Sequence, residues 1–213
     1  MRTSGKRAQS LHNLSAWYAG RSGDLTSSSL QPFMKIEYSE KIDKEIIREV
    51  NKMCPSLSKV MGFNFDKKVK FDKRFIQVAK AVAKASEDFF DEKKMRGVMD
   101  KIYKTKMPEV KVFINTSGFA TWNIKKKYIS VPMNFMGESF FNHACHEANH
   151  FMYDFAFGTK KYEDTEIKEI ITVINNAFGI HDSGWPKFRE KREKVLDVYN
   201  KTKDIGSVID SLK

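Results

Sequence analysis

The chain has 213 residues, of which 41% are hydrophobic and 13% aromatic, and this composition predicts a packed globular protein rather than a disordered one. Its formal net charge of +11 would suit an anionic partner such as nucleic acid, but the lysines are interleaved with acidic residues, so we expect mainly solvated helix faces. No apolar run approaches the ~20 residues of a membrane-spanning helix. Two cysteines, Cys54 and Cys145, are too few for a disulfide framework, which favours a reducing, cytoplasmic location.

Residues 1–33 differ in composition from the remainder of the chain. Ser and Gly are frequent there, Asp24 is the only acidic residue, and Arg outnumbers Lys, whereas Lys predominates after Met34. The segment is either an organelle transit peptide, which would allow import, or a flexible non-native leader produced by read-through ahead of a natural start at Met34. We expect the second, because the change from Arg to Lys falls almost at that methionine. The body of the protein is then a single domain, residues 34–213.

The first half of this body has helical periodicity. Ile42, Ile46 and Val50 recur at helical spacing after a cap at Ser39, which predicts a helix over about 39–52, with Pro55 as a break. A second helix is predicted over about 73–90. The apolar residues on one face of it are Phe75, Val78, Ala79, Val82 and Ala83. The helix resumes through Met95, Val98, Met99, Ile102 and Tyr103. We expect these helices to serve as scaffold.

The hydrophobic period changes from helical to alternating after residue 108. Apolar and polar residues alternate over 110–115, turn residues follow at 116–118, and two further short strands are predicted at 121–124 and 128–131. We therefore expect a small antiparallel meander over about 110–132. An exposed edge of such a sheet can bind an extended peptide by strand addition, although the edge can equally be solvated.

A helix predicted over about 137–155 contains the sequence His146-Glu147-x-x-His150. The two histidines stand at i and i+4, so their imidazoles project from one side and can reach one zinc ion at ~2.0–2.1 Å. Glu147 between them can act as a general base. The opposite face is apolar and is expected to pack in the core. It consists of Phe141, Ala144, Ala148, Phe151, Met152 and Phe155.

A catalytic zinc site needs a third protein ligand, and a helix predicted from about Asp164 supplies two candidates. Glu169 follows His150 after eighteen intervening residues, beside polar neighbours that could bond to it. Glu166 lies in an otherwise apolar stripe, where an uncompensated carboxylate would be costly unless it bound a metal. Either residue could instead belong to an ordinary acidic first turn of a helix. Spacing favours Glu169 and burial favours Glu166, and we expect Glu169.

This combination of His-Glu-x-x-His, eighteen residues and Glu resembles the gluzincin metallopeptidases, which include thermolysin-like enzymes and the zinc aminopeptidases. The resemblance covers about residues 110–180. It implies an α+β, zincin-like fold, mostly helical, with a small antiparallel sheet next to the active-site helix. It also implies that His146, His150 and Glu169 bind Zn²⁺, and that Glu147 is the general base of a hydrolase acting on peptide or protein substrates.

The chain departs from the family in two respects. The Gly-x-Met-Glu-Asn segment by which zinc aminopeptidases bind a free amino terminus is absent, so exopeptidase activity is not expected. The Asn-Glu pair and following carboxylate of thermolysin-like enzymes are also missing, because Lys168 precedes Glu169 and Val173 stands four positions on. The groups that orient the metal ligands must therefore differ from those of the family.

Three further residues are weaker candidates. His143 extends the motif and could support the metal ligands, while Tyr162 and His181 flank the third-ligand helix and could stabilise an oxyanion; each could instead be a surface or core residue. A basic helix over 187–201 and a short amphipathic tail complete the chain, and we expect them to pack on the core. The alternative function is a basic nucleic-acid-binding or interaction protein with a structural or vestigial metal site.

Overall fold

The computed structural model describes residues 35–61 and 68–212, with the side chains of 53–61 left aside. They belong to one compact unit that extends from Met34 to Lys213. The expectations for the leader, residues 1–33, and for the side chain of Cys54 lie outside the described residues. Within the described part, the fold is mostly helical with one small sheet, which confirms the α+β class.

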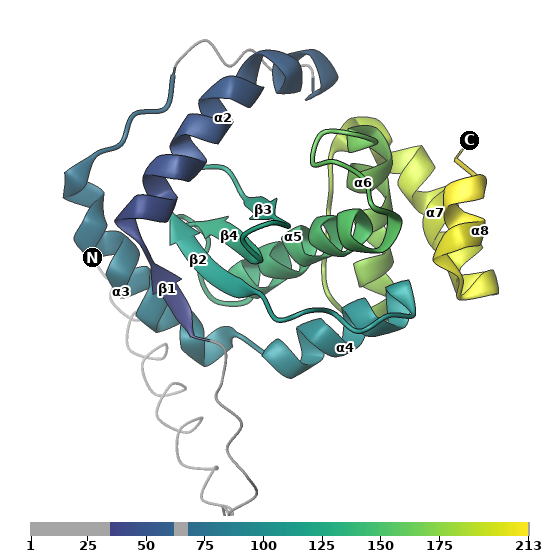
Figure 1. The fold of residues 1–213 in the computed structure, drawn as a ribbon. Helices are drawn as coiled ribbons and strands as arrows, with labels where there is room; N and C mark the ends of the chain where they lie inside the picture. The colour runs from purple at the N-terminus through teal and green to yellow at the C-terminus, as the bar shows by residue number, and fades with distance from the viewer. Residues whose placement is uncertain (1–34, 62–67, 213) are drawn as a thin grey trace, which may run out of the picture. The chain divides into compact units, whose positions relative to one another are not determined.

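The sheet has four strands in the order β1-β2-β4-β3 (Figure 1). Their bounds are β1 Ile36–Tyr38, β2 Lys111–Asn115, β3 Thr121–Asn123 and β4 Tyr128–Pro132. β1 pairs parallel with β2, β2 pairs parallel with β4, and only β3 is antiparallel to its neighbour. The predicted antiparallel meander is therefore wrong, although its three strands are present. The sheet is mixed, and β1 was not predicted because three residues carry too little periodicity.

The loop after β2 decides this topology. The side chain of Asn115 donates to the carbonyl of Phe119 at 3.0 Å and to the hydroxyl of Ser130 at 2.8 Å. Buried Asp43 accepts hydrogen bonds from the backbone and the hydroxyl of Thr116 at 2.9 and 2.7 Å. Asn115 thus ties the end of β2 to β4, and Asp43 of the first long helix ties the loop to that helix. β3 forms the outer edge, and β4 lies between β3 and β2.

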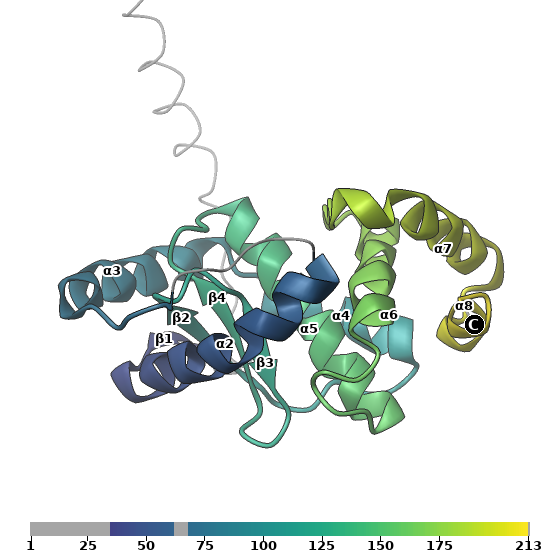
Figure 2. The same ribbon diagram turned by 90° about the horizontal axis from the view of Figure 1, so that it is seen from above.

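Helices cover both faces of the sheet (Figure 2). On one face, Phe113 and Tyr128 pack with Ile46 and Val50 of helix α2, Glu40–Met61. The other face lies in the main core with helices α3, Ile76–Ser86, and α4, Glu92–Tyr103, and with α5, Glu138–Phe157. This explains why all five residues of β4 are buried, since a sheet covered on both sides has no solvated face.

The helices of the first half differ in detail from the prediction. α2 continues through Pro55 to Met61, so the predicted break there is wrong. The stretch 73–90 comprises a 3-10 turn at Lys73–Phe75, then α3, then a 3-10 turn at Glu87–Phe89. Phe75, which ends the first 3-10 turn, and Val78 are 41% and 49% exposed, so only Ala79, Val82 and Ala83 of the predicted apolar face are buried. The predicted apolar face of α4 is confirmed, since all five of its residues are buried.

The second half is helical after α5. α6, Thr165–Ile171, continues into a 3-10 helix, Thr172–Phe178, and a further 3-10 turn at Pro186–Phe188 leads into α7, Arg189–Thr202, and α8, Ile205–Asp210. α7 packs against α6 and the 3-10 helix, and α8 packs against α7. None of the helices in the described ranges has the length and apolar character required to cross a bilayer.

Candidate metal centre

One face of helix α5 packs in the hydrophobic core, and the opposite face presents His146, Glu147 and His150. Four of the six residues on the predicted apolar face, Ala144, Ala148, Phe151 and Met152, are at most 1% exposed, whereas Phe155 near the end of the helix is 44% exposed. Burying a side chain as large as phenylalanine or methionine contributes roughly 1.5–3 kcal/mol. This packing holds the opposite face, with His146, Glu147 and His150, in a defined position beside the sheet.

The two imidazoles of α5 converge on one point. His146 Nε2 and His150 Nε2 are 2.9 Å apart, and their rings are almost perpendicular. The side chain of His150 is 1% exposed and that of His146 is 19% exposed. Two imidazole nitrogens that face each other at this distance can share a proton in a hydrogen bond, or both can bind one metal cation.

Glu169 on α6 brings a carboxylate to the same point. Its oxygens lie 3.4 Å from His150 Nε2 and 3.6 Å from His146 Nε2, and the indole N–H of Trp185 donates to the carboxylate at 3.1 Å. Glu166 lies elsewhere. It pairs with Lys191 of α7 at 2.5 Å and its side chain is 49% exposed, so the burial expected for Glu166 is wrong.

Glu147 is the third member of the cluster on α5. Its side chain is buried. One potential ligand atom from each of His146, Glu147 and His150 lies within 4.8 Å of the other two. Within the described residues, Glu147 Oε2 has no hydrogen-bond partner. Burial raises the pKa of this carboxyl group, and the neighbouring His150 and His146 only partly oppose that effect. A buried carboxylate of raised pKa with one oxygen unpartnered is suited to accept and release a proton.

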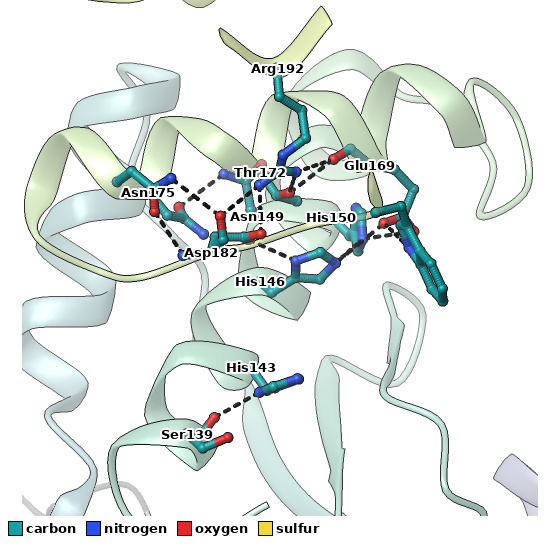
Figure 3. A network of polar contacts seen from close by, with 12 residues as sticks. Ser139, His143, His146, Asn149, His150, Glu169, Thr172, Asn175, Asp182 and Arg192 are labelled. Atoms are coloured by element: carbon teal, nitrogen blue, oxygen red, sulfur yellow. Dashed lines mark hydrogen bonds and ion pairs between the residues drawn. The ribbon is translucent and has the colours of Figure 1, made fainter. Parts of the chain in front are cut away.

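Asp182 joins the candidate site, although the sequence did not indicate it. His146 Nδ1 donates to Asp182 Oδ2 at 2.8 Å, which directs Nε2 of the same ring toward His150 and Glu169 (Figure 3). Buried Arg192 of α7 donates to the other Asp182 oxygen at 2.7 Å. Asp182 lies 36 residues from His146, in a segment without regular structure, so no motif spacing could point to it.

The charges of these residues stabilise one another. Burial alone would lower the pKa of His146, but the carboxylates of Asp182 and Glu169 outweigh it and raise that pKa well above 6.5. Burial alone would raise the pKa of Glu169, but His150 and His146 lower it below the usual range for a carboxyl group. The pKa of Asp182 is likewise lowered, against burial, by His146 and Arg192. These side chains together therefore favour a positive charge between the two histidines and Glu169.

The spacing of these groups fits a tetrahedral metal. Ligand atoms at about 2.0–2.1 Å from zinc stand about 3.3–3.4 Å from one another. His146 Nε2 and His150 Nε2 are 2.9 Å apart, Glu169 Oε1 lies 3.4 Å from His150 Nε2, and Glu169 Oε2 lies 3.6 Å from His146 Nε2. These separations lie on either side of the tetrahedral spacing. Two imidazoles and one carboxylate leave a fourth position for water, as catalytic zinc sites require.

The remaining candidates occupy the periphery. His143 lies one turn before His146 and Glu147, stacks on Phe135, and donates from Nδ1 to the carbonyl of Ser139 at 2.8 Å (Figure 3). Burial lowers the pKa of His143. Tyr162 is 54% exposed and His181 is also exposed. The structure therefore does not bring His143, Tyr162 or His181 into the His146–His150–Glu169 cluster.

Comparisons of the chain with models of known protein families, with curated proteins and with solved structures find no match.

Gly184 supports Asp182 by leaving room for Arg192, and this gives a prediction for stability. Its φ is +56°, and a Cβ added there would lie 2.3 Å from Arg192 Cζ, whereas Gly179, with φ +70°, has open space. Gly184→Ala is expected to lower the free energy of unfolding by about 1–3 kcal/mol, through backbone strain and displacement of Arg192. Urea denaturation of the metal-free protein measures the effect. Gly179→Ala, which carries strain alone, should cost less, and equal losses in the two variants would show that Arg192 accommodates the methyl group.

Proposed function

We propose that this protein is a zinc-dependent metallopeptidase of the gluzincin type, with a zincin-like domain, in which His146, His150 and Glu169 hold the metal. The observation that carries the proposal is the convergence of three groups of suitable chemistry from two helices on one point, at separations that suit zinc. The resemblance of the motif spacing to the gluzincins supports the same ligand set.

Zinc held by these residues would supply Lewis acidity, lowering the pKa of a water molecule and polarising a substrate carbonyl. Glu147 stands next to the two histidines with one carboxylate oxygen unpartnered. In the proposed reaction Glu147 takes a proton from the attacking water and delivers it to the leaving amine. Asp182 fixes the His146 ring through Nδ1, and Trp185 fixes the Glu169 carboxylate.

The edge strand β3 offers a place for the substrate. β3 is the last strand of the described sheet on the side of α5 and pairs with β4 alone. Its residue Trp122 lies against the ring of His150, with centroids 4.7 Å apart. An extended peptide that adds to the outer edge of β3 would pass beside the histidines, so we propose internal peptide bonds of extended or unfolded proteins as the substrate.

Metal analysis of the full chain, purified without chelators, tests the proposal. We expect one zinc per chain and hydrolysis of denatured casein that a chelator abolishes and added zinc restores. Protein without stoichiometric metal would contradict the proposal. Salt-sensitive binding to DNA by such metal-free protein, without hydrolysis, would instead support a basic nucleic-acid-binding protein.

Asp182→Asn is predicted to weaken zinc binding by about 10–100-fold, as expected for a group that orients a histidine ligand. The wild-type affinity should also depend on pH. Because the pKa of His146 is raised well above 6.5, a proton competes with zinc for this imidazole even at and above pH 6.5. Below that raised pKa, the zinc affinity should fall about tenfold for each pH unit. In Asp182→Asn the decline should begin at lower pH, since a charge that raises the pKa is removed. Competition with a fluorescent chelator measures both effects.

Asp197→Asn is the matched control for this variant, since Asp197 is an exposed aspartate on α7. It should leave the affinity and its pH dependence unchanged. An Asp182→Asn protein that binds zinc as tightly as the wild type at every pH would show that Asp182 does not orient His146.

A further inference from the structure

A buried ion pair joins α5 to α6 immediately before Glu169. Lys168 Nζ contacts Asp154 Oδ1, and the two side chains are 1% and 0% exposed. The same amine donates to the carbonyl of Lys160 at 2.8 Å. Removing two charges from water is expensive, so a pair of this kind adds little net stability compared with well-packed apolar residues. Its effect is to fix the position of the elements that it joins.

The Asp154 carboxylate of this pair is also connected to the candidate metal centre, through Trp122 and His150. Asp154 Oδ2 accepts a hydrogen bond from the indole N–H of Trp122 at 2.7 Å. The Trp122 ring lies against the ring of His150 at a centroid distance of 4.7 Å and an angle of 32°. Asp154 therefore holds the aromatic ring on which His150 rests.

His150 needs such support because its ring lacks the usual orienting bond. A histidine that binds a metal through one nitrogen almost always donates from the other to a carboxylate, a carbonyl or water. His146 does so through Asp182, but in the described part of the chain Nδ1 of buried His150 has no partner. Packing against Trp122 is then the contact that sets the orientation of the His150 ring.

We propose that Asp154 and Lys168 are positioning residues of the metal centre, Asp154 orienting His150 through Trp122 and Lys168 placing its neighbour Glu169. One ion pair thus sets the positions of two of the three proposed ligands, His150 on α5 and Glu169 on α6. The inference rests on the proposed zinc site, and it concerns the affinity of that site rather than the stability of the fold.

The test replaces both charges together, in the double variant Asp154→Leu/Lys168→Met, and measures zinc affinity by chelator competition alongside thermal unfolding of the metal-free protein. We expect the Tm to stay within about 3 °C of the wild type, since apolar residues can replace a buried pair without loss. The zinc affinity should fall about 10–100-fold. Lys168→Met alone leaves the Asp154 charge unpaired and should lower the Tm by roughly 10 °C.

Lys104→Met is the control, because it removes an ion pair with Asp204 that is exposed and joins other elements. The Lys104→Met variant should keep both the zinc affinity and the Tm of the wild type. Trp122→Phe provides a second test that keeps both charges and replaces the indole, with its N–H, by a smaller ring. It should lower the zinc affinity about tenfold. Its Tm should fall less than that of Lys168→Met, because the ion pair is kept, and it decides the matter if the double variant does not fold.

The outcomes separate this inference from the proposed function. Wild-type protein that binds zinc, with variants that bind it equally tightly, would overturn the positioning role and leave the proposed function intact. Wild-type protein that binds no zinc would overturn both.

Discussion

Glu147→Gln is expected to lower kcat for peptide hydrolysis by about 10²–10⁴-fold while one zinc ion per chain is retained. The amide has nearly the shape of the carboxylate but cannot accept a proton at neutral pH. Because Glu147 is not one of the proposed ligands, the three groups proposed to hold zinc are unchanged in the variant. Hydrolysis of a fluorescent casein and metal content by atomic emission, measured on the same preparation, give both quantities.

Glu138→Gln is the matched control, since Glu138 is an exposed acid in the first turn of the same helix α5. It changes the charge of the helix by the same amount and should keep full activity. An active Glu147→Gln protein would remove the proposed general base. Loss of zinc in Glu147→Gln would show instead that Glu147 is itself a ligand, as its closeness to the two histidines allows.

His146→Ala and His150→Ala are each expected to weaken zinc binding by more than about 100-fold, beyond the loss that follows from removing an orienting group. Each substitution removes one of the three proposed protein ligands. The wild type should gain about 2.7 kcal/mol of stability when free zinc reaches about 100 times the Kd, and both variants should lose this gain. Thermal unfolding with and without zinc, together with metal content, measures the effect.

His143→Ala distinguishes a metal ligand from a histidine that merely lies on the same helix. His143 is one turn from His146, but its Nδ1 is bonded to the Ser139 carbonyl and its ring stacks on Phe135. The variant should retain one zinc per chain and the stabilisation that zinc provides. Equal zinc loss in all three histidine variants would mean that the metal is held differently from the proposal.

The sheet shows where the prediction from sequence was limited. Alternation over 110–115 and 128–131 located β2 and β4 correctly, but period-two alternation is the same in parallel and antiparallel strands. Direction depends on the loop after β2, which Asn115 and Asp43 hold through bonds to residues far along the chain. The antiparallel meander was therefore predicted from local pattern and corrected by contacts that are not local.

The choice between Glu166 and Glu169 shows a second limit. Spacing along the chain favoured Glu169, and the structure places Glu169 beside the histidines. The apolar stripe around Glu166 suggested burial, but α7 packs against α6 and offers Lys191 to Glu166 at the surface. Whether a helix position is buried depends on which elements pack against it, and the pattern within one helix does not contain that information.

By itself, the sequence determined the local features of this protein. These are most of the helices and strands and the one helical turn that presents His146, Glu147 and His150, because residues at i and i+4 share a face wherever that helix lies. The spacing also predicted Glu169, but only the tertiary structure decided which other groups meet that turn from elsewhere. Asp182 comes from an irregular segment, and the ion pair of Asp154 and Lys168 links α5 to α6. Such contacts depend on how the chain folds back on itself, and no spacing rule in the sequence encodes them.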